Sequence, residues 1–195
     1  SRIAWLLETE QAEPFGILAV TFTNKAAFEM RTRLEDTLKF SLRGMWIGTF
    51  HSLCHRILRL HHRDAGLIEN FQILDSDDQV RLCRRVIRAR GLDEKLYQPR
   101  VLTNFINGHK EEGRRAQHIE VYNDAFTKNL VQLYHDYQTL CEQSGLVDFS
   151  EILLRTVELL RTHQAILNHY QERFKFVLVD EFQDTNSVQY AWLQL

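Results

Sequence analysis

Residues 176–186 read FVLVDEFQDTN, an apolar run that ends directly in Asp180 and Glu181, with Asp184 three positions further on. A run that is apolar at every position is typical of a strand covered on both faces, as in a parallel sheet with helices on each side. Ligands of such sheets bind beyond the carboxyl ends of the strands. The stretch therefore predicts an α/β fold whose functional edge begins at Asp180.

Two segments near the start of the chain also join a short apolar run to a helix. Residues 17–20 read as a buried strand, and the helix pattern that follows can be capped by Thr23 or Asn24. Residues 46–49 read as another strand, and the helix after them has one fully apolar face. Strands and helices thus alternate at this end of the chain, as a parallel sheet requires.

The middle of the chain, residues 50–174, is predicted to be helical, with one strand at residues 71–74. Ser76 and Gln79 have the spacing of a capping box, and Gly91 stands where a C-terminal cap belongs. Further helices are expected over residues 100–110, 123–143 and 149–160. The predicted fold class is therefore α/β and predominantly helical, with a parallel sheet interrupted by a helical insert.

The composition is that of a globular protein and argues against a disordered chain and against a membrane-spanning one. Of the 195 residues, 44% are hydrophobic and 26% are charged, which is too rich in core-forming residues for disorder. The net charge of −2 gives no global attraction to nucleic acid, so such binding has to use local groups. No apolar run approaches the roughly 18 residues of a membrane span. Three isolated cysteines favour a reducing compartment, which indicates the cytoplasm.

The carboxylates after the last strand suggest magnesium and nucleotide chemistry. Mg2+ prefers oxygen ligands, commonly one or two carboxylates together with substrate phosphates, and Asp180 at a strand end suits that role. Glu181 can orient or deprotonate a water for attack on a phosphate, and Gln183 can sense that phosphate. The alternative is that Asp180 and Asp184 only cap a helix that begins near Asn186. The sequence leaves both readings open.

Four segments together resemble a known family. They are VDEFQDTN at 179–186, LAVTFTNKAAFEM at 18–30, WIGTFHSLCHRILR at 46–59 and LVDFSEILLR at 146–155. In this order they resemble the UvrD/Rep/PcrA group of superfamily 1 DNA helicases, over the whole chain and most of all its UvrD branch. The DEFQD segment differs from the DEAD and DEAH signatures of RNA helicases.

The resemblance implies a RecA-like motor domain, 1A, at residues 1–49 and 175–195, with the all-helical subdomain 1B inserted at residues 50–174. It implies an ATP-dependent, Mg2+-requiring helicase that moves three-prime to five-prime on single-stranded DNA. The expected partners are single-stranded DNA, junctions of single strand and duplex, and DNA repair proteins, in the bacterial cytoplasm at the nucleoid. No membrane is expected among the partners.

The family's site residues fall on named positions of this chain. Asp180 matches the magnesium ligand, Glu181 the water-activating base, and Gln183 the glutamine that contacts the nucleotide region. The DNA-contacting positions are matched by Thr21, Phe22, Thr23, Asn24 and Lys25 in one motif and by Thr49 and His51 in the next. Phe22 is expected to stack a base. A core position for Phe22, and a capping or solvated role for Asn24 and Lys25, remain alternatives.

A phosphate-binding loop of the form G-x-x-x-x-G-K-[ST] is absent from the sequence, and in the family it lies just upstream of the matched region. The chain is therefore expected to be a piece of a longer protein and to be inactive as an ATPase on its own. The rival hypothesis is a non-enzymatic DNA-binding or partner-docking protein with a helicase-like shell. A phosphate-binding loop upstream would favour the motor, and a start codon near Ser1 would favour the rival.

Three further groups of residues are weaker candidates for functional sites. His51, Cys54 and His55 share one helix, but no Glu follows His51 as a zinc-protease motif requires, so a metal site there is disfavoured. An arginine-rich helix face can meet duplex phosphates or can simply be solvated, and the second is favoured; its members are Arg81, Arg84, Arg85, Arg88 and Arg90. Asp148 is interpreted first as a helix cap and second as part of the family's DNA-side motif.

Overall fold

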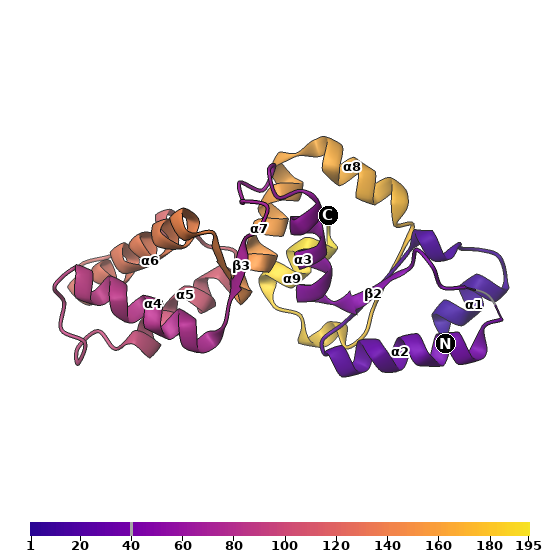
Figure 1. The fold of residues 1–195 in the computed structure, drawn as a ribbon, viewed down its shortest axis with the longest axis horizontal. Coiled ribbons are helices and arrows are strands. Elements are labelled where there is room, and N and C mark those ends of the chain that lie inside the picture. Colours follow the sequence, from indigo (N-terminus) through magenta and orange to yellow (C-terminus); the bar gives the residue numbers. More distant parts are fainter. Residues whose placement is uncertain (40) are drawn as a thin grey trace.

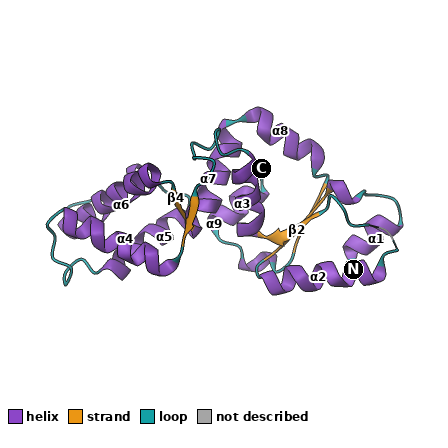
Figure 2. Ribbon diagram, in the orientation of Figure 1, coloured by secondary structure: helices purple, strands orange, loops and turns teal. Residues whose placement is uncertain are grey.

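The computed structural model describes residues 1–39 and 41–195 (Figures 1 and 2). Its α-helices are α1 Arg2–Glu8, α2 Asn24–Thr37, α3 Phe50–Leu60, α4 Ser76–Ala89, α5 Pro99–Glu111, α6 Ala125–Ser144, α7 Phe149–Thr162, α8 Gln164–Arg173 and α9 Ser187–Leu193. Its strands are β1 Ile17–Thr21, β2 Trp46–Thr49, β3 Gln72–Leu74, β4 Leu146–Asp148 and β5 Phe176–Val179. Short 3-10 helices lie at η1 Pro14–Gly16, η2 Ala116–His118 and η3 Phe182–Asp184.

The molecule is elongated and has two lobes (Figure 1). The helical lobe consists of α4, α5 and α6, and the sheet lobe contains the remaining α-helices around β1, β2 and β5. The short strands β3 and β4 lie where the lobes meet. The predicted α/β, predominantly helical fold is therefore confirmed.

The sheet of the larger lobe is parallel, with strand order β2-β1-β5. Leu18 pairs with Trp46 and with Val177, so β1 is the central strand. Side chains of β1 alternate between the two faces, as the pleat requires. Ile17 and Ala19 pack into a cluster with α1 and α2, whereas Leu18 and Val20 pack into one with α3, α7 and α9. Coverage on both faces explains why this strand is continuously apolar.

Strand β5 is less covered than its continuously apolar sequence predicts. Strand β5 pairs with β1 along one edge, and no other strand pairs with it in residues 1–39 and 41–195. Phe176 and Leu178 pack on the α1–α2 side and Val179 on the other side, but Val177 is 47% exposed. Full burial of β5 was thus a wrong prediction, because an edge strand in this fold leaves part of one face open.

The helical lobe has its own core and a small sheet at its base. Buried side chains of α4, α5 and α6 form one cluster that includes Cys83, Ile106 and Tyr134. Strands β3 and β4 pair in parallel, with Ile73 opposite Val147, so the insert is not entirely helical. Strand β4 was not predicted, because it has only three residues and lies directly between the end of α6 and the start of α7.

Packing divides the chain at β3 and β4. Along the first crossing, Phe71 packs in the core of the sheet lobe and Leu74 in the core of the helical lobe. Along the second, Leu146 packs in the core of the helical lobe and Val147 in that of the sheet lobe. Helices α3 and α7 therefore share a core with β1 and β2. The predicted domain limits at residues 49 and 175 stay a prediction, and the packing provides a second, inner division to set beside them.

Helix ends test the predicted caps. Thr23 caps α2, with its hydroxyl accepting a hydrogen bond from the N–H of Ala26 at 3.1 Å, as predicted. The Ser76 cap was wrong: Asp75 caps α4 by accepting from the Asp78 N–H at 2.8 Å. Gln79 is buried instead and bonds to Asn107, which removes it from the predicted capping box. Helix α8 was not predicted because Tyr170 is its one buried residue, which leaves little apolar pattern.

None of the helices in the described ranges combines the length and apolar character that a membrane span requires.

Candidate functional site

The carboxyl ends of the three parallel strands meet at one edge of the sheet. Thr21 at the end of β1 pairs with Thr49 at the end of β2. On the other side, the N–H of Asp180 donates to the carbonyl of Val20 at 3.0 Å. The three polar segments singled out in the sequence are therefore neighbours, with β1 in the middle.

Thr21 itself is buried inside this edge. Its side chain has no solvent exposure, and its hydroxyl donates to the carbonyl of Thr23 at 3.2 Å and to that of Gly48 at 3.5 Å. These bonds tie the turn after β1 to the end of β2. The Thr21 side chain thus has a structural role, and a contact of this residue with DNA is restricted to its backbone.

A hollow of about 460 Å³ opens between β1, β2 and the start of α7, and we call it the edge hollow. Five of its lining residues are predicted DNA contacts: Phe22, Thr23, Asn24, Thr49 and His51. The rest of the lining is Ser52, His55, Ile73, Phe149 and Ile152. Lys25 stands outside it on α2 with a side chain that is 86% exposed. Residues from four separate parts of the sequence are thereby brought together.

Three helices begin at the edge hollow. Thr23 caps α2, Thr49 caps α3 through a capping box with Ser52, and Asp148 caps α7 by accepting from the Glu151 N–H at 2.8 Å. The first turn of a helix carries unpaired N–H groups and a partial positive charge, which favours anions such as phosphate. The edge hollow therefore has positive character although few cationic side chains line it.

Two aromatic rings border the edge hollow. Phe22 lies with its ring centroid 5.3 Å from that of Phe50 and is partly buried, so one part of the ring packs on the core and the rest faces the opening. Phe149 is 52% exposed, and its centroid lies 5.5 Å from that of His51. Although Phe149 is apolar, it is the first residue of α7, directly after the cap Asp148, and lies outside the core.

The two histidines of the edge hollow are held neutral. Burial lowers the pKa of His51, although a hydrogen bond with the Phe149 backbone acts in the opposite direction. Burial and the charge of Arg59 lower the pKa of His55, whose Nε2 accepts a hydrogen bond from Arg59 at 3.0 Å. Since no carboxylate lines the edge hollow either, its side chains are uncharged near pH 7. Such a surface suits flat, apolar ligand faces.

The turn after β5 carries the predicted nucleotide residues. Asp180, Glu181 and Gln183 are all exposed. The N–H of Glu181 donates to Asp180 Oδ1 at 3.1 Å, and Gln183 Nε2 donates to Glu181 Oε2 at 2.6 Å. Glu181 has a left-handed backbone, with φ of 55°, a conformation that costs a residue other than glycine about 1–3 kcal/mol. Strain of this kind is common where a side chain is aimed at a ligand.

The capping alternative for these carboxylates is wrong. Helix α9 is capped by Asn186, which forms a capping box with Gln189. Asp184 contributes its backbone N–H to the carbonyl of Glu181 at 2.9 Å, within η3. Neither Asp180 nor Asp184 therefore serves the helix, and the exposed carboxylates need another explanation.

The donor set of this turn fits magnesium. Two exposed carboxylates at a strand end offer hard oxygen ligands, and Mg2+ usually takes its remaining ligands from water and substrate phosphates. In residues 1–39 and 41–195, no cluster of three or more His, Cys, Asp or Glu side chains is placed to enclose a metal. His51, Cys54 and His55 do not converge, because Cys54 is fully buried and burial raises the pKa of its thiol.

The arginine-rich face of α4 is partly neutralised. Arg81 pairs with Asp78 at 2.8 Å, Arg84 and Arg88 pair with Glu94, and Arg90 pairs with Asp136. These pairs lie at the surface, where each contributes little to stability, but their three carboxylates offset part of the positive charge of the five arginines. The interpretation as a solvated face is therefore favoured over a phosphate-binding one.

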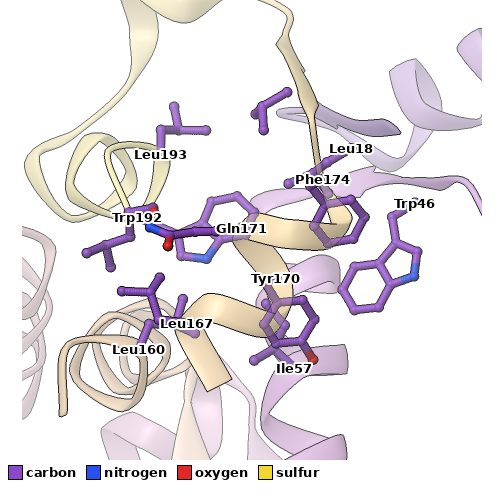
Figure 3. A pocket seen from close by; sticks show the side chains of 12 residues that line it. Leu18, Trp46, Ile57, Leu160, Leu167, Tyr170, Gln171, Phe174, Trp192 and Leu193 are labelled. Carbon is purple, nitrogen blue, oxygen red and sulfur yellow. Dashed lines mark hydrogen bonds between the residues drawn. The ribbon is translucent and has the colours of Figure 1, made fainter. Parts of the chain in front are cut away.

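A second pocket, of about 110 Å³, lies on the α8–α9 side of the sheet (Figure 3). Aromatic and aliphatic side chains line it, among them Trp46, Tyr170, Phe174 and Trp192. Gln171 is the polar side chain of its lining, and its Nε2 donates to the carbonyl of Leu195 at 2.6 Å. None of the predicted site residues lines this pocket, so we assign it to the packing of the sheet lobe.

Comparison with known proteins agrees with the geometry. The family described as UvrD/REP helicase N-terminal domain matches residues 1–195. The chain is 53% identical over 194 residues to DNA helicase II of Escherichia coli K12 and 35% identical over 195 residues to the ATP-dependent DNA helicase PcrA of Staphylococcus epidermidis. Each match covers all of this chain and 27% of the relative, so the chain spans about a quarter of their length.

Proposed function

This chain belongs to the UvrD/REP helicase family, and on that premise we propose that it is part of an ATP-dependent DNA helicase that holds single-stranded DNA in the edge hollow. One observation carries the proposal: five residues that the motifs predict as DNA contacts line one hollow, although they come from two distant segments. Two aromatic rings and three helix N-termini at the same place supply what bases and phosphates need.

The proposed binding mode uses stacking more than charge. Phe22 and Phe149 offer ring faces to bases, which every base can accept regardless of sequence. The N–H groups at the start of α2 and the exposed Lys25 serve the phosphates. Because few cations take part, binding should be weak in this chain alone and should depend only shallowly on salt, corresponding to about two to four phosphate contacts.

The proposed chemistry lies on the other side of β1. Asp180 would hold a magnesium ion, and Glu181, which accepts a hydrogen bond from Gln183, would take a proton from the attacking water. Magnesium, when bound, would offset charge on the nucleotide phosphates. Glu181, two positions after the end of β5, has a left-handed backbone with φ of 55°. ATP and Mg2+ are thus the proposed cofactors of the full-length protein.

Strand β1 provides the proposed link between the two sites. The carbonyl of Val20 binds the Asp180 N–H on one side, and the next residue, Thr21, is tied to Gly48 on the other. Phe22 follows directly. We call the turn after β5 that carries Asp180, Glu181 and Gln183 the carboxylate turn. A movement of this turn on nucleotide binding would pass to the Phe22 ring through the backbone of Val20, Thr21 and Phe22.

The finer parts of the proposal come from the motif resemblance. They are three-prime to five-prime translocation, action in DNA repair together with repair proteins at single-strand/duplex junctions, a cytoplasmic location at the bacterial nucleoid, and the 1A/1B division at residues 49 and 175. The experiment is an unwinding assay with the full-length protein, ATP and Mg2+, on duplexes with either a three-prime or a five-prime single-stranded tail. Unwinding of the three-prime-tailed duplex supports the proposal; DNA binding without DNA-stimulated ATP hydrolysis would favour the non-enzymatic alternative.

A second experiment separates this chain from the full-length protein. Its sequence has no phosphate-binding loop, so Asp180 and Glu181 alone should hold magnesium and ATP weakly. Calorimetric titration with ATP and Mg2+ should show no site in the micromolar range or tighter. A tight site would mean that the nucleotide pocket lies elsewhere in the chain.

A further inference from the structure

A cluster of buried charges joins the helical lobe to the sheet lobe. Lys110 on α5 is fully buried, and its Nζ lies 2.7 Å from both Asp148 Oδ2 and Glu151 Oε2. The hydroxyl of Tyr137 on α6 donates to the same Asp148 oxygen at 2.7 Å. Asp148 is the N-cap of α7 and Glu151 belongs to its first turn, so Lys110 and Tyr137 together tie the start of α7 to two helices of the other lobe.

Arginines complete the cluster around Glu151. Arg115 donates to both carboxylate oxygens of Glu151, at 2.6 and 2.7 Å, and Arg155 Nε donates to Oε1 at 2.9 Å. Burial alone would raise the pKa of Glu151, but Lys110, Arg115 and Arg155 hold it well below its ordinary value. The carboxylate is therefore ionised and saturated with donors.

Such a cluster is a poor means of adding stability, because the cost of removing charges from water offsets most of their attraction. Its best-attested use is to specify one arrangement of the elements that carry it, since any other arrangement leaves a buried charge unpaired. Here the arrangement that it specifies is the position of the first turn of α7 relative to α5 and α6.

That turn also forms part of the edge hollow. Phe149 and Ile152 line the hollow, and each directly follows a residue of the cluster, Asp148 and Glu151. Asp148 and Glu151 of this turn are thus held by buried charges, while Phe149 and Ile152 face the hollow in which DNA is proposed to bind. Phe149 itself has few packing contacts to hold it, since it is 52% exposed.

We propose that Lys110 is a positioning residue for single-stranded DNA: through Asp148 and Glu151 it fixes the first turn of α7, and thereby sets the Phe149 ring where a base stacks. The inference rests on the proposed DNA-binding function of the edge hollow. It assigns a role in that function to a residue of the helical lobe that lies outside the hollow.

The test is a double-mutant cycle between Lys110→Met and Phe149→Ala, read as affinity for fluorescent oligo-dT. Phe149→Ala should weaken binding by about 5- to 150-fold, the scale of one lost base stack. Lys110→Met should weaken oligo-dT binding to a similar extent. The double variant should bind no more weakly than the single variant with the lower affinity, because each substitution removes the same base stack. Lys128→Met, the same change at an exposed site of α6, should bind like wild type.

Additive effects in a folded double variant would overturn the proposal, and so would wild-type DNA affinity in Lys110→Met. If Lys110→Met loses its circular dichroism spectrum, Tyr137→Phe takes its place in the cycle, because it removes one hydrogen bond to Asp148 and keeps the ring. A smaller, non-additive loss is then expected. If wild type itself fails to bind oligo-dT, the proposed function fails; if it binds and the cycle is additive, only the role of Lys110 fails.

Discussion

The edge hollow and the carboxylate turn lie on either side of β1, yet they are built very differently. The hollow is bordered by three capped helices and by rings that pack on the core, with Phe22 against Phe50 as an example. The carboxylate turn follows an edge strand, and Asp180, Glu181 and Gln183 are exposed and contact mainly one another. On the proposed function, this chain thus holds a formed hollow for DNA and exposed carboxylates that would make one wall of a nucleotide site.

On the proposed function, this difference predicts that DNA binding and ATP hydrolysis can be changed separately by substitution. The hollow is formed within this chain by capped helix ends and by the packing of Phe22 on Phe50, so substitutions there should change DNA affinity. Side chains at the turn have few partners of their own, so substitutions there should change turnover and leave DNA affinity alone.

The largest effect is expected at Glu181. In the full-length protein, Glu181→Gln should lower DNA-stimulated ATP turnover by roughly 100-fold or more, because the proposed general base is lost. DNA affinity should stay unchanged. Steady-state ATPase at saturating oligo-dT measures the first quantity and fluorescence anisotropy the second, with Glu172→Gln on α8 as the matched control. Wild-type turnover in Glu181→Gln would remove the chemical role from the turn.

The next effect is expected at Phe22. Phe22→Ala should weaken oligo-dT binding by about 1–3 kcal/mol at every salt concentration, because a base loses its stacking partner. Phe28→Ala is the matched control: Phe28 lies one turn along α2, is 70% exposed and does not line the hollow. Anisotropy titrations at several salt concentrations give both affinities. Equal losses in the two variants would show that aromatic surface in general, and not the hollow, attracts DNA.

A smaller effect is expected at Lys25. Lys25→Ala should lower the slope of log affinity against log salt by about one, the signature of one lost phosphate contact. Its ion pair with Glu29, at 3.9 Å on the surface, competes little with a phosphate. Lys128→Ala in the helical lobe should leave the slope unchanged. An unchanged slope in Lys25→Ala would place the phosphates elsewhere.

The smallest effect concerns the burial of His51. Burial lowers the pKa of His51 in the folded chain, so the unfolded chain binds more protons at mildly acidic pH. The stability that neutral His51 allows is present above the unfolded pKa of about 6.5 and decreases as pH falls below it. In His51→Gln, the drop in melting temperature between pH 7.5 and pH 5.5 should be smaller than in wild type. An equal drop in both proteins would contradict the burial of His51.

Much of this fold was predictable because local patterns decide it. The strand at 46–49 and the apolar face of α3 were predicted correctly, since β-strand and helix periodicities there agree with burial. Thr23 was predictable as a cap because its hydroxyl acts within its own helix turn. Five of the seven predicted DNA residues share a hollow because parallel strands end at one edge, a rule of topology that the sequence order already contains.

The features that could not be predicted depend on contacts between residues far apart in the sequence. Nothing near Lys110 in the sequence indicates that it is fully buried, because its partners Asp148 and Glu151 lie about 40 positions away in another lobe. Phe149 fits the apolar stripe of α7, and only the cap at Asp148 turns it outward. The exposure of Val177 follows from its edge position, which periodicity cannot reveal.

The most direct measurement of the central claim is photocrosslinking of this chain to oligo-dT that contains 4-thiothymidine, followed by identification of the crosslinked peptides. DNA bound in the edge hollow should crosslink at Phe22 and its neighbours and at Phe149. Both crosslinks should disappear in the double variant Phe22→Ala/Phe149→Ala, while charge reversal at Arg84 and Arg85 should leave them unchanged. Crosslinks confined to α4, and lost on that charge reversal, would contradict the account and place the DNA on the helical lobe.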